Sequence, residues 1–232
     1  MTQQASTAHP IDKTRIRDAA TVIVHRSGPE GPEVLMGQRG AKAAFMPNKF
    51  VFPGGAVDAS DAQVTLAAPA DPDSMRRLSI DAPAHMPVAC LVAAIREVWE
   101  ETGLILGRPK RWDAPNADWE GFAETGHAPD AAALRYVFRA ITPPGRPRRF
   151  DARFLLAPAS ALVGDLDDFS RASDELSHLQ WVPLSRARSF DLPFITEVVL
   201  AELGPLILSG DAPQSVPFVE NDDPISSVRR LR

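Results

Sequence analysis

The stretch Arg-Glu-Val-Trp-Glu-Glu-Thr-Gly at positions 96–103 is the most informative part of this chain, because it places three carboxylates within five residues. The surrounding pattern predicts an α-helix over residues 88–102, in which side chains recur at about 100° per residue. Its apolar positions fall on one side, and Glu97, Glu100 and Glu101 gather on the other. We therefore expect one buried face and one acidic face. The expected buried stripe is Val88, Leu91, Val92, Ile95, Trp99 and Thr102.

The acidic face has two interpretations. Charge runs usually mark a face that is simply solvated. Like charges three and four residues apart repel each other by a few tenths of a kcal/mol per pair, so the cluster gains a use only if a cation binds to it. Mg²⁺ and Mn²⁺ prefer carboxylate and water oxygens and would fit such a cluster.

The sequence upstream of the helix favours the second interpretation. The run Phe-Val-Phe-Pro-Gly-Gly at positions 50–55 predicts a short apolar strand that ends in a tight turn. Glycines at such a turn allow the backbone to bend sharply or to approach another group closely. Asp61 follows Gly55 after five intervening residues.

Together, Gly55, Asp61 and the stretch at 96–103 resemble the Nudix box, G-x5-E-x7-R-E-U-x-E-E-x-G-U. The second half matches at every fixed position, with Val98 and Leu104 at the aliphatic sites. The match departs from the box in two respects. Asp61 replaces the family's glutamate, and 34 residues separate it from Arg96 where the family has seven, so an insertion of 27 residues splits the box.

The insertion covers residues 62–87 and contains four prolines and only a brief helical pattern around 74–80. We expect it to be a surface excursion whose base lies near the metal site, because long loops in compact domains are usually functional or disordered. The split box and the segment 142–154 resemble the Nudix branch that includes the mammalian peroxisomal acyl-coenzyme A diphosphatases.

The resemblance implies an α+β fold, namely the Nudix α/β/α sandwich with a mixed β-sheet. Residues 1–15 are expected to form a flexible lead-in, residues 16–210 the hydrolase domain, and residues 211–232 a C-terminal arm against the body or a partner. Alternation and turn signals predict a hairpin from residues 17–25 and 33–39, further strands at 49–52, 134–141, 150–156 and 180–184, and a second helix at 191–208. A short helical piece is expected within residues 110–130.

Composition excludes several classes of protein. The chain has 232 residues, of which 44% are hydrophobic, enough for one domain with additions. A net charge of −5 argues against a nucleic-acid binder. No apolar run is long enough to span a bilayer, and Cys90 has no partner for an internal disulfide. These features predict a soluble cytoplasmic protein that acts on a small molecule, and we allow for a homodimer.

By the resemblance, one to three Mg²⁺ or Mn²⁺ ions would bind Glu97, Glu100 and Glu101 with the main-chain carbonyl of Gly54. Arg96 is expected to pair with a carboxylate of the box, for example Glu100, and hold it in its ligating rotamer. Asp61, one methylene shorter than glutamate, would support the site from behind. Its reach is in question, so we expect Asp61→Glu to be neutral or to improve activity.

Two assignments remain open in the catalytic machinery. The general base is either a glutamate of the box or Glu175 in a later loop, and Asp174-Glu175 could equally be an ordinary polar turn. Arg39, at the end of the second strand, is a candidate for contact with a substrate phosphate. A cluster of arginines beside Phe150 is a second candidate for anion binding. The alternative is that these arginines form a solvated strand edge, which discourages pairing with other strands. The cluster consists of Arg146, Arg148, Arg149 and Arg153.

The implied activity is hydrolysis of the diphosphate in a nucleoside diphosphate linked to another group X, with coenzyme A or acyl-coenzyme A as candidate substrates. The alternative is a catalytically weak, Nudix-like nucleotide-binding or regulatory module. Asp61 and the split box keep that alternative open. The intact glutamates argue against it, since a pure binder has no need for a repulsive carboxylate cluster.

Overall fold

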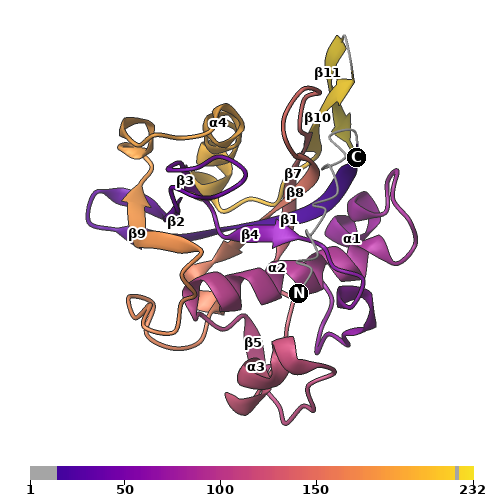
Figure 1. Cartoon of the computed structure of the whole chain (residues 1–232), viewed down its shortest axis with the longest axis vertical. Helices are drawn as coiled ribbons and strands as arrows, with labels where there is room; N and C mark the ends of the chain where they lie inside the picture. The colour runs from indigo at the N-terminus through magenta and orange to yellow at the C-terminus, as the bar shows by residue number, and fades with distance from the viewer. Residues whose placement is uncertain (1–14, 223–224) are drawn as a thin grey trace, which may run out of the picture.

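The computed structural model describes residues 15–222 and 225–232, and these residues form a nine-stranded mixed sheet that lies between two long helices (Figure 1). The strands are β1 (Ile16–Gly28), β2 (Gly31–Arg39), β3 (Phe50–Val51), β4 (Gly54–Ala56), β7 (Arg135–Ile141), β8 (Arg149–Pro158), β9 (Leu176–Pro183), β10 (Val216–Asp222) and β11 (Ile225–Leu231), and β5 (Gly107–Pro109) and β6 (His127–Pro129) pair separately. The helices are α1 (Pro72–Leu78), α2 (Met86–Thr102), α3 (Glu120–Glu124) and α4 (Phe194–Ser209).

The sheet has the order β11-β10-β7-β8-β1-β2-β3, with β4 beside β1 and β9 beside β2. Two pairs, β1 with β8 and β7 with β10, are parallel, and the other pairs are antiparallel. The predicted α+β class with a mixed sheet is therefore confirmed. The predicted first hairpin is also present, and Gly31, with a φ of 104°, closes its turn opposite Gly28.

The two long helices cover opposite faces of the sheet, as Figure 1 shows with α2 and α4 on either side of β1. Alternate side chains of β1 point to the two layers, which is the period-2 pattern of a strand. Val22 and Val24 join the core under α2, whereas Ile23 joins the core under α4. Both predicted long helices are thus present, and each closes one of the two cores.

The prediction that residues 62–87 are a surface excursion is wrong. Val64, Ala70 and Leu78 are buried in the core under α2, and the hydroxyl of Ser74 accepts a hydrogen bond from the main-chain N–H of Tyr136 on β7. Asp71 caps the first turn of α1 by accepting from the N–H of Ser74. The insertion folds because its scattered apolar residues find a partner surface that local periodicity does not reveal.

The C-terminal residues are also more than an arm. They form the hairpin β10–β11, and β10 extends the sheet by pairing with β7 (Figure 1). Arg77 of the insertion donates to the main-chain oxygens of Pro213 and Gln214, so the insertion and the C-terminal segment hold each other. The predicted lead-in at residues 1–15 lies, apart from Arg15, outside the described residues.

Among the residues that the model describes, no helix combines the length and the apolar character needed to cross a membrane.

Candidate active site

The site is built where the acidic side of α2 meets the turn that precedes β4. The N–H of Gly54 donates to Oε2 of Glu101 at 2.7 Å. A Cβ added to Gly55 would lie 2.3 Å from Oε1 of Glu97, so only glycine permits this approach. The helix ends at Gly103, whose φ of 73° gives the left-handed cap expected for a glycine there. The two glycines of the turn therefore let the strand backbone lie against the helix carboxylates.

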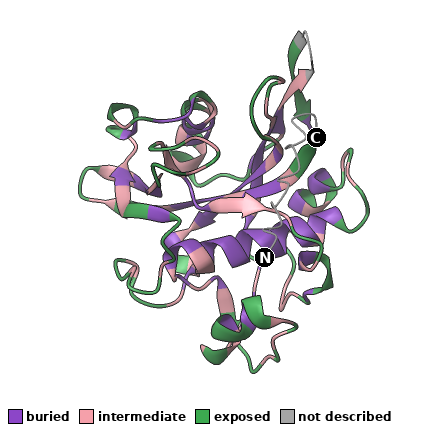
Figure 2. Cartoon of the chain, in the orientation of Figure 1, coloured by how far each residue is buried: buried purple, intermediate pink, exposed green. Residues whose placement is uncertain are grey.

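The predicted two-faced helix is only partly correct. Glu97 and Glu101 are buried and Glu100 is half-buried, and Figure 2 shows α2 buried along most of its length. The acidic side is covered by β4 and by the 3-10 turn Asp61–Gln63, which come from elsewhere in the chain. The carboxylates are therefore not a solvated helix face.

Arg96 connects the carboxylates of the site. Its Nη1 donates to Glu97 at 2.9 Å and to Glu100 at 3.2 Å, so the predicted pairing with Glu100 is confirmed. Its Nε and Nη2 donate to the two oxygens of Asp61 at 3.0 and 3.1 Å, and Nη2 also donates to the carbonyl of Ala56. One guanidinium therefore fixes the positions of three carboxylates.

Asp61 contacts Arg96 through both of its carboxylate oxygens, so its shorter side chain does not prevent the pairing. It is fully buried, and its Oδ2 also accepts from the N–H of Asp58 at 2.8 Å. Because this fork-to-fork pair joins residues 61 and 96, it closes the split motif despite the insertion.

We expect Asp61→Glu to lower the free energy of unfolding by about 1–3 kcal/mol, because an added methylene has no room in a fully buried, paired position. The expectation from the motif concerned the activity of this variant, and it stays a prediction. Urea unfolding of the metal-free protein measures the change. Asp58→Glu is the matched control, since that side chain is 56% exposed and its variant should stay close to the parent. Equal stability of the two variants would contradict the packing argument.

Burial and mutual repulsion make the carboxylates reluctant to ionise. Burial, followed by the charge of Glu97, raises the pKa of Glu101 to about 8. Burial likewise raises the pKa of Glu97 to about 7, although Arg96 partly opposes the shift. The pKa of Glu100 is also raised, mainly by burial. The single guanidinium of Arg96 thus leaves the cluster short of positive charge.

Comparisons with known proteins agree with this geometry. A crystal structure of a NUDIX hydrolase from Alicyclobacillus acidocaldarius superposes with a TM-score of 0.61 over 85% of this chain and 97% of that chain, at 29% identity. The putative nudix hydrolase 7 of Caenorhabditis elegans is 31% identical over 179 residues, which are 72% of this chain and 51% of the relative. This chain belongs to the Nudix superfamily.

A second curated relative of this Nudix protein is the acyl-coenzyme A diphosphatase NUDT19 of Gallus gallus, 27% identical over 205 residues, which are 60% of this chain and 54% of the relative. The chain thus spans about half the length of the curated relatives it matches. No family model matches the chain.

Two predicted residues from other elements face the Nudix glutamates. Glu175 lies in the exposed turn before β9. Burial is the main cause of the raised pKa of Glu97 and of Glu101, and the negative charge of Glu175 adds to both shifts. The same loop is tied to the Nudix helix, because the N–H of Ser173 donates to the carbonyl of Glu100 at 2.8 Å. Arg39 lies at the end of β2, and its positive charge lowers the pKa of Glu101. Its Nε is buried without a hydrogen-bond partner among the described residues, and the contact of Arg39 with a substrate phosphate stays a prediction.

Two acidic residues near the Nudix box escaped the sequence analysis. Oδ2 of Asp58 lies 3.7 Å from Nη2 of Arg96. Burial of Glu100 is the main cause of its raised pKa, and the negative charge of Asp118 adds to that shift. Asp58 could have been noticed from its place between Gly55 and Asp61. Asp118 follows no motif, and only the folding of residues 110–130 beside the helix brings it near.

The arginine cluster requires a correction. Arg153 is almost fully buried, and pairs with Asp18 at 2.7 Å and Asp151 at 3.3 Å. Arg149 donates to the main-chain oxygens of Thr142 and Asn221. These two side chains hold strands together, so we withdraw their assignment to substrate. Arg146 and Arg148 are exposed and stay a prediction.

Within residues 15–222 and 225–232, no group of three or more acidic, histidine or cysteine side chains forms a cage that could hold a metal ion. Arg96 is bonded to both Glu97 and Glu100, and the Glu101 carboxylate faces the N–H of Gly54. Mg²⁺ does not need such a cage, since it usually keeps several waters and takes only one or two carboxylates from a protein.

Proposed function

We propose that this protein is a divalent-metal-dependent diphosphatase that hydrolyses a nucleoside diphosphate linked to another group X. The observation that carries the proposal is the site in which Asp61, Glu97 and Glu100 share the single guanidinium of Arg96, with the carboxylate of Glu101 buried on the same helix against the N–H of Gly54. A purely structural cluster would be expected to balance its buried charges. A site that binds a cation needs the opposite, an excess of negative charge.

The donor set fits Mg²⁺ or Mn²⁺, since every candidate ligand is an oxygen. Glu97, Glu100 and Glu101 are the candidate carboxylate ligands, of which a Mg²⁺ ion would take one or two, and the carbonyl of Gly54 would assist from the adjoining turn. Burial raises the pKa of Glu97 and of Glu101, and a divalent cation beside them would favour their ionised forms. When bound, the ion supplies positive charge at the phosphoryl oxygens and makes a bound water more acidic.

The protein's own residues provide orientation and proton transfer. Arg96 keeps Glu97 and Glu100 in fixed rotamers, and Asp61 keeps Arg96 in place. Arg39, whose positive charge acts on Glu101, would bind a phosphate oxygen. A box glutamate or Glu175 would take the proton as water adds to one phosphorus, and the bond from that phosphorus to the bridging oxygen would break. Both products then carry a phosphate.

Coenzyme A or an acyl-coenzyme A is our first candidate for the substrate. The support is the 27% identity to the acyl-coenzyme A diphosphatase NUDT19 of Gallus gallus. A regulatory module without catalysis would not need the three glutamates of the helix, two of which pair with Arg96, but it would explain an absence of turnover. The substrate is in either case a small nucleoside diphosphate derivative.

We expect hydrolysis only in the presence of Mg²⁺ or Mn²⁺ and complete loss of activity in excess chelator, with the fold retained. The test uses coenzyme A, acetyl-coenzyme A, ADP-ribose, NADH and a dinucleoside polyphosphate, and separates the phosphate-bearing products by chromatography. Circular dichroism of the chelated sample checks that the protein is still folded. Full activity in chelator would refute the metal-dependent mechanism, and no turnover of any substrate would favour the regulatory module.

A further inference from the structure

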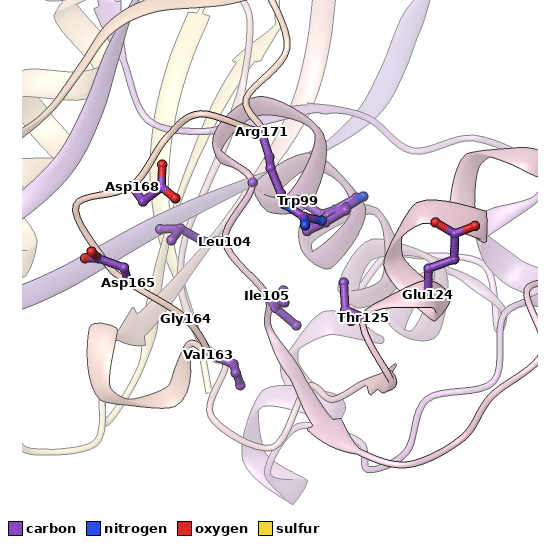
Figure 3. Close-up of a pocket in the computed structure, with 11 residues that line it drawn as sticks. Trp99, Leu104, Ile105, Glu124, Thr125, Val163, Gly164, Asp165, Asp168 and Arg171 are labelled. Atoms are coloured by element: carbon purple, nitrogen blue, oxygen red, sulfur yellow. The ribbon is translucent and has the colours of Figure 1, made fainter.

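A second concave feature lies at the end of the Nudix helix, next to the proposed site but outside it. The pocket has a volume of about 380 Å³, within the range of small-molecule sites. Figure 3 shows its lining side chains, which come from the last turn of α2, from α3 and from the loop at residues 163–171. The loop that lines it continues to Ser173, whose N–H donates to the carbonyl of Glu100. A substrate that occupied both places would extend past the last turn of the helix, which contains Glu100.

The walls of this pocket are held by bonds that need no ligand. The N–H of Val163 donates to the carbonyl of Ile105 at 2.9 Å, at one end of the loop. The N–H of Ser173 fixes the other end to Glu100, and the indole N–H of Trp181 donates to the carbonyl of Leu166 between them. The pocket is thus largely preformed, which reduces the entropic cost of binding.

The lining favours an uncharged ligand over a phosphate. Three exposed carboxylates, Glu124, Asp165 and Asp168, face a single cation, Arg171. The N–H of Ser170 holds the pKa of Asp168 below its usual value, so this carboxylate is ionised at neutral pH. Carboxylates accept hydrogen bonds from N–H and O–H groups and repel phosphates.

The pocket also offers apolar surface. Trp99 is partly exposed and packs edge-on against Phe122, with the ring centroids 5.7 Å apart. The partly buried Ile105 and Val163 line the pocket as well. An indole surface accepts either a planar base or a flat amide. The complementary ligand therefore has an apolar or planar face and several N–H or O–H donors.

We propose that this pocket binds an uncharged, donor-rich part of the substrate while the diphosphate lies at the Nudix glutamates, an assignment that rests on the proposed function. Two moieties share this chemistry. One is the pantetheine arm of coenzyme A, with its amides and hydroxyls, and the other is a nucleoside without a ribose phosphate. A nucleoside with a 3′-phosphate is excluded by the three carboxylates.

The test measures binding to the metal-free protein by nuclear magnetic resonance, with the indole N–H of Trp99 and the amides of residues 163–171 as reporters. The probes are pantetheine, adenosine and adenosine 3′,5′-bisphosphate. Pantetheine or adenosine should shift these signals at millimolar concentration, and whichever does so identifies the moiety. The bisphosphate should leave them unchanged. The proposal is overturned if neither uncharged probe shifts them, or if the bisphosphate shifts them as strongly.

Paired variants test the role of the carboxylates. Asp165→Asn with Asp168→Asn should weaken binding of the uncharged probe about tenfold, since hydrogen bonds to charged groups are lost. The substitution keeps the Oδ1 atoms, which accept from the N–H groups of Asp167 and Ser170, so the loop should remain in place. Glu120→Gln, an exposed residue of α3 that does not line the pocket, should bind as the parent does. Equal binding by all variants would contradict the proposal.

These experiments also separate this proposal from the proposed function. Binding of an uncharged probe without hydrolysis of any substrate would refute the diphosphatase and leave the pocket assignment standing. Hydrolysis of a substrate that does not perturb Trp99 or residues 163–171 would refute only the pocket assignment.

Discussion

Glu101→Gln should lower kcat by about 10²-fold or more, the scale expected when a charged group that stabilises the transition state is lost. Glu101 is the most deeply buried carboxylate of the Nudix helix, and glutamine keeps its shape and its ability to accept from the N–H of Gly54. Only the charge is removed. Steady-state kinetics with Mg²⁺, on whichever substrate the panel identifies, measure the effect. Glu100→Gln should give a loss of similar size.

The matched control is Glu197→Gln, which changes an exposed glutamate of α4 on the opposite face of the sheet. This variant should retain the parent's kcat. If Glu101→Gln and Glu197→Gln had equally small effects, the glutamates of the helix would be structural and the proposed diphosphatase would be wrong.

The metal-free protein should become less stable as the pH rises from about 5 to about 8, by a few kcal/mol. In the folded state the pKa of Glu97 is raised to about 7 and that of Glu101 to about 8, from 4.5. Between pH 4.5 and 8 the folded protein therefore binds more protons than the unfolded chain. In that case linkage requires the free energy of unfolding to fall as the pH increases. Urea unfolding at several pH values measures the slope.

Added Mg²⁺ or Mn²⁺ should restore stability, and more at pH 8 than at pH 6, because a metal binds the deprotonated carboxylates. Glu101→Gln should reduce the pH dependence to the part that comes from Glu97, so a variant with a much lower kcat should gain stability at pH 8. Glu197→Gln should keep the parent's slope. A metal-free protein that becomes more stable between pH 5 and pH 8 would contradict the charge imbalance at the site.

The local pattern of the sequence was enough to predict the Nudix helix and the first hairpin. The helix follows from apolar residues at helical spacing and from Gly103, and the structure places it at Met86–Thr102. The hairpin follows from two apolar runs on either side of a glycine-proline turn. The pairing of Arg96 with Glu100 could also be predicted, because residues four apart on a helix are neighbours.

The insertion and the C-terminal segment could not be predicted in this way. Residues 62–87 have no regular apolar period, yet Val64 and Leu78 are core residues. The strand β10 joins the main sheet by pairing with β7, which lies far earlier in the chain. Its own sequence does not indicate that partner. In both cases the stabilising contacts are between residues distant in sequence, where local propensity carries little information.

The sequence by itself determined the chemistry of this protein, since the types and spacing of Glu97, Glu100, Glu101 and Arg96 define an acidic site on a helix. Only the tertiary structure decided how that site is used. It buries the carboxylates, closes the split box through Asp61, and brings Arg39 and Glu175 to the same place. It also buries Arg153 against Asp18 and Asp151, and it bonds the half-buried Arg149 to main-chain oxygens. The physical reason is that charge and hydrogen-bonding capacity belong to each residue, whereas burial and pairing depend on neighbours that the fold brings together from distant parts of the chain.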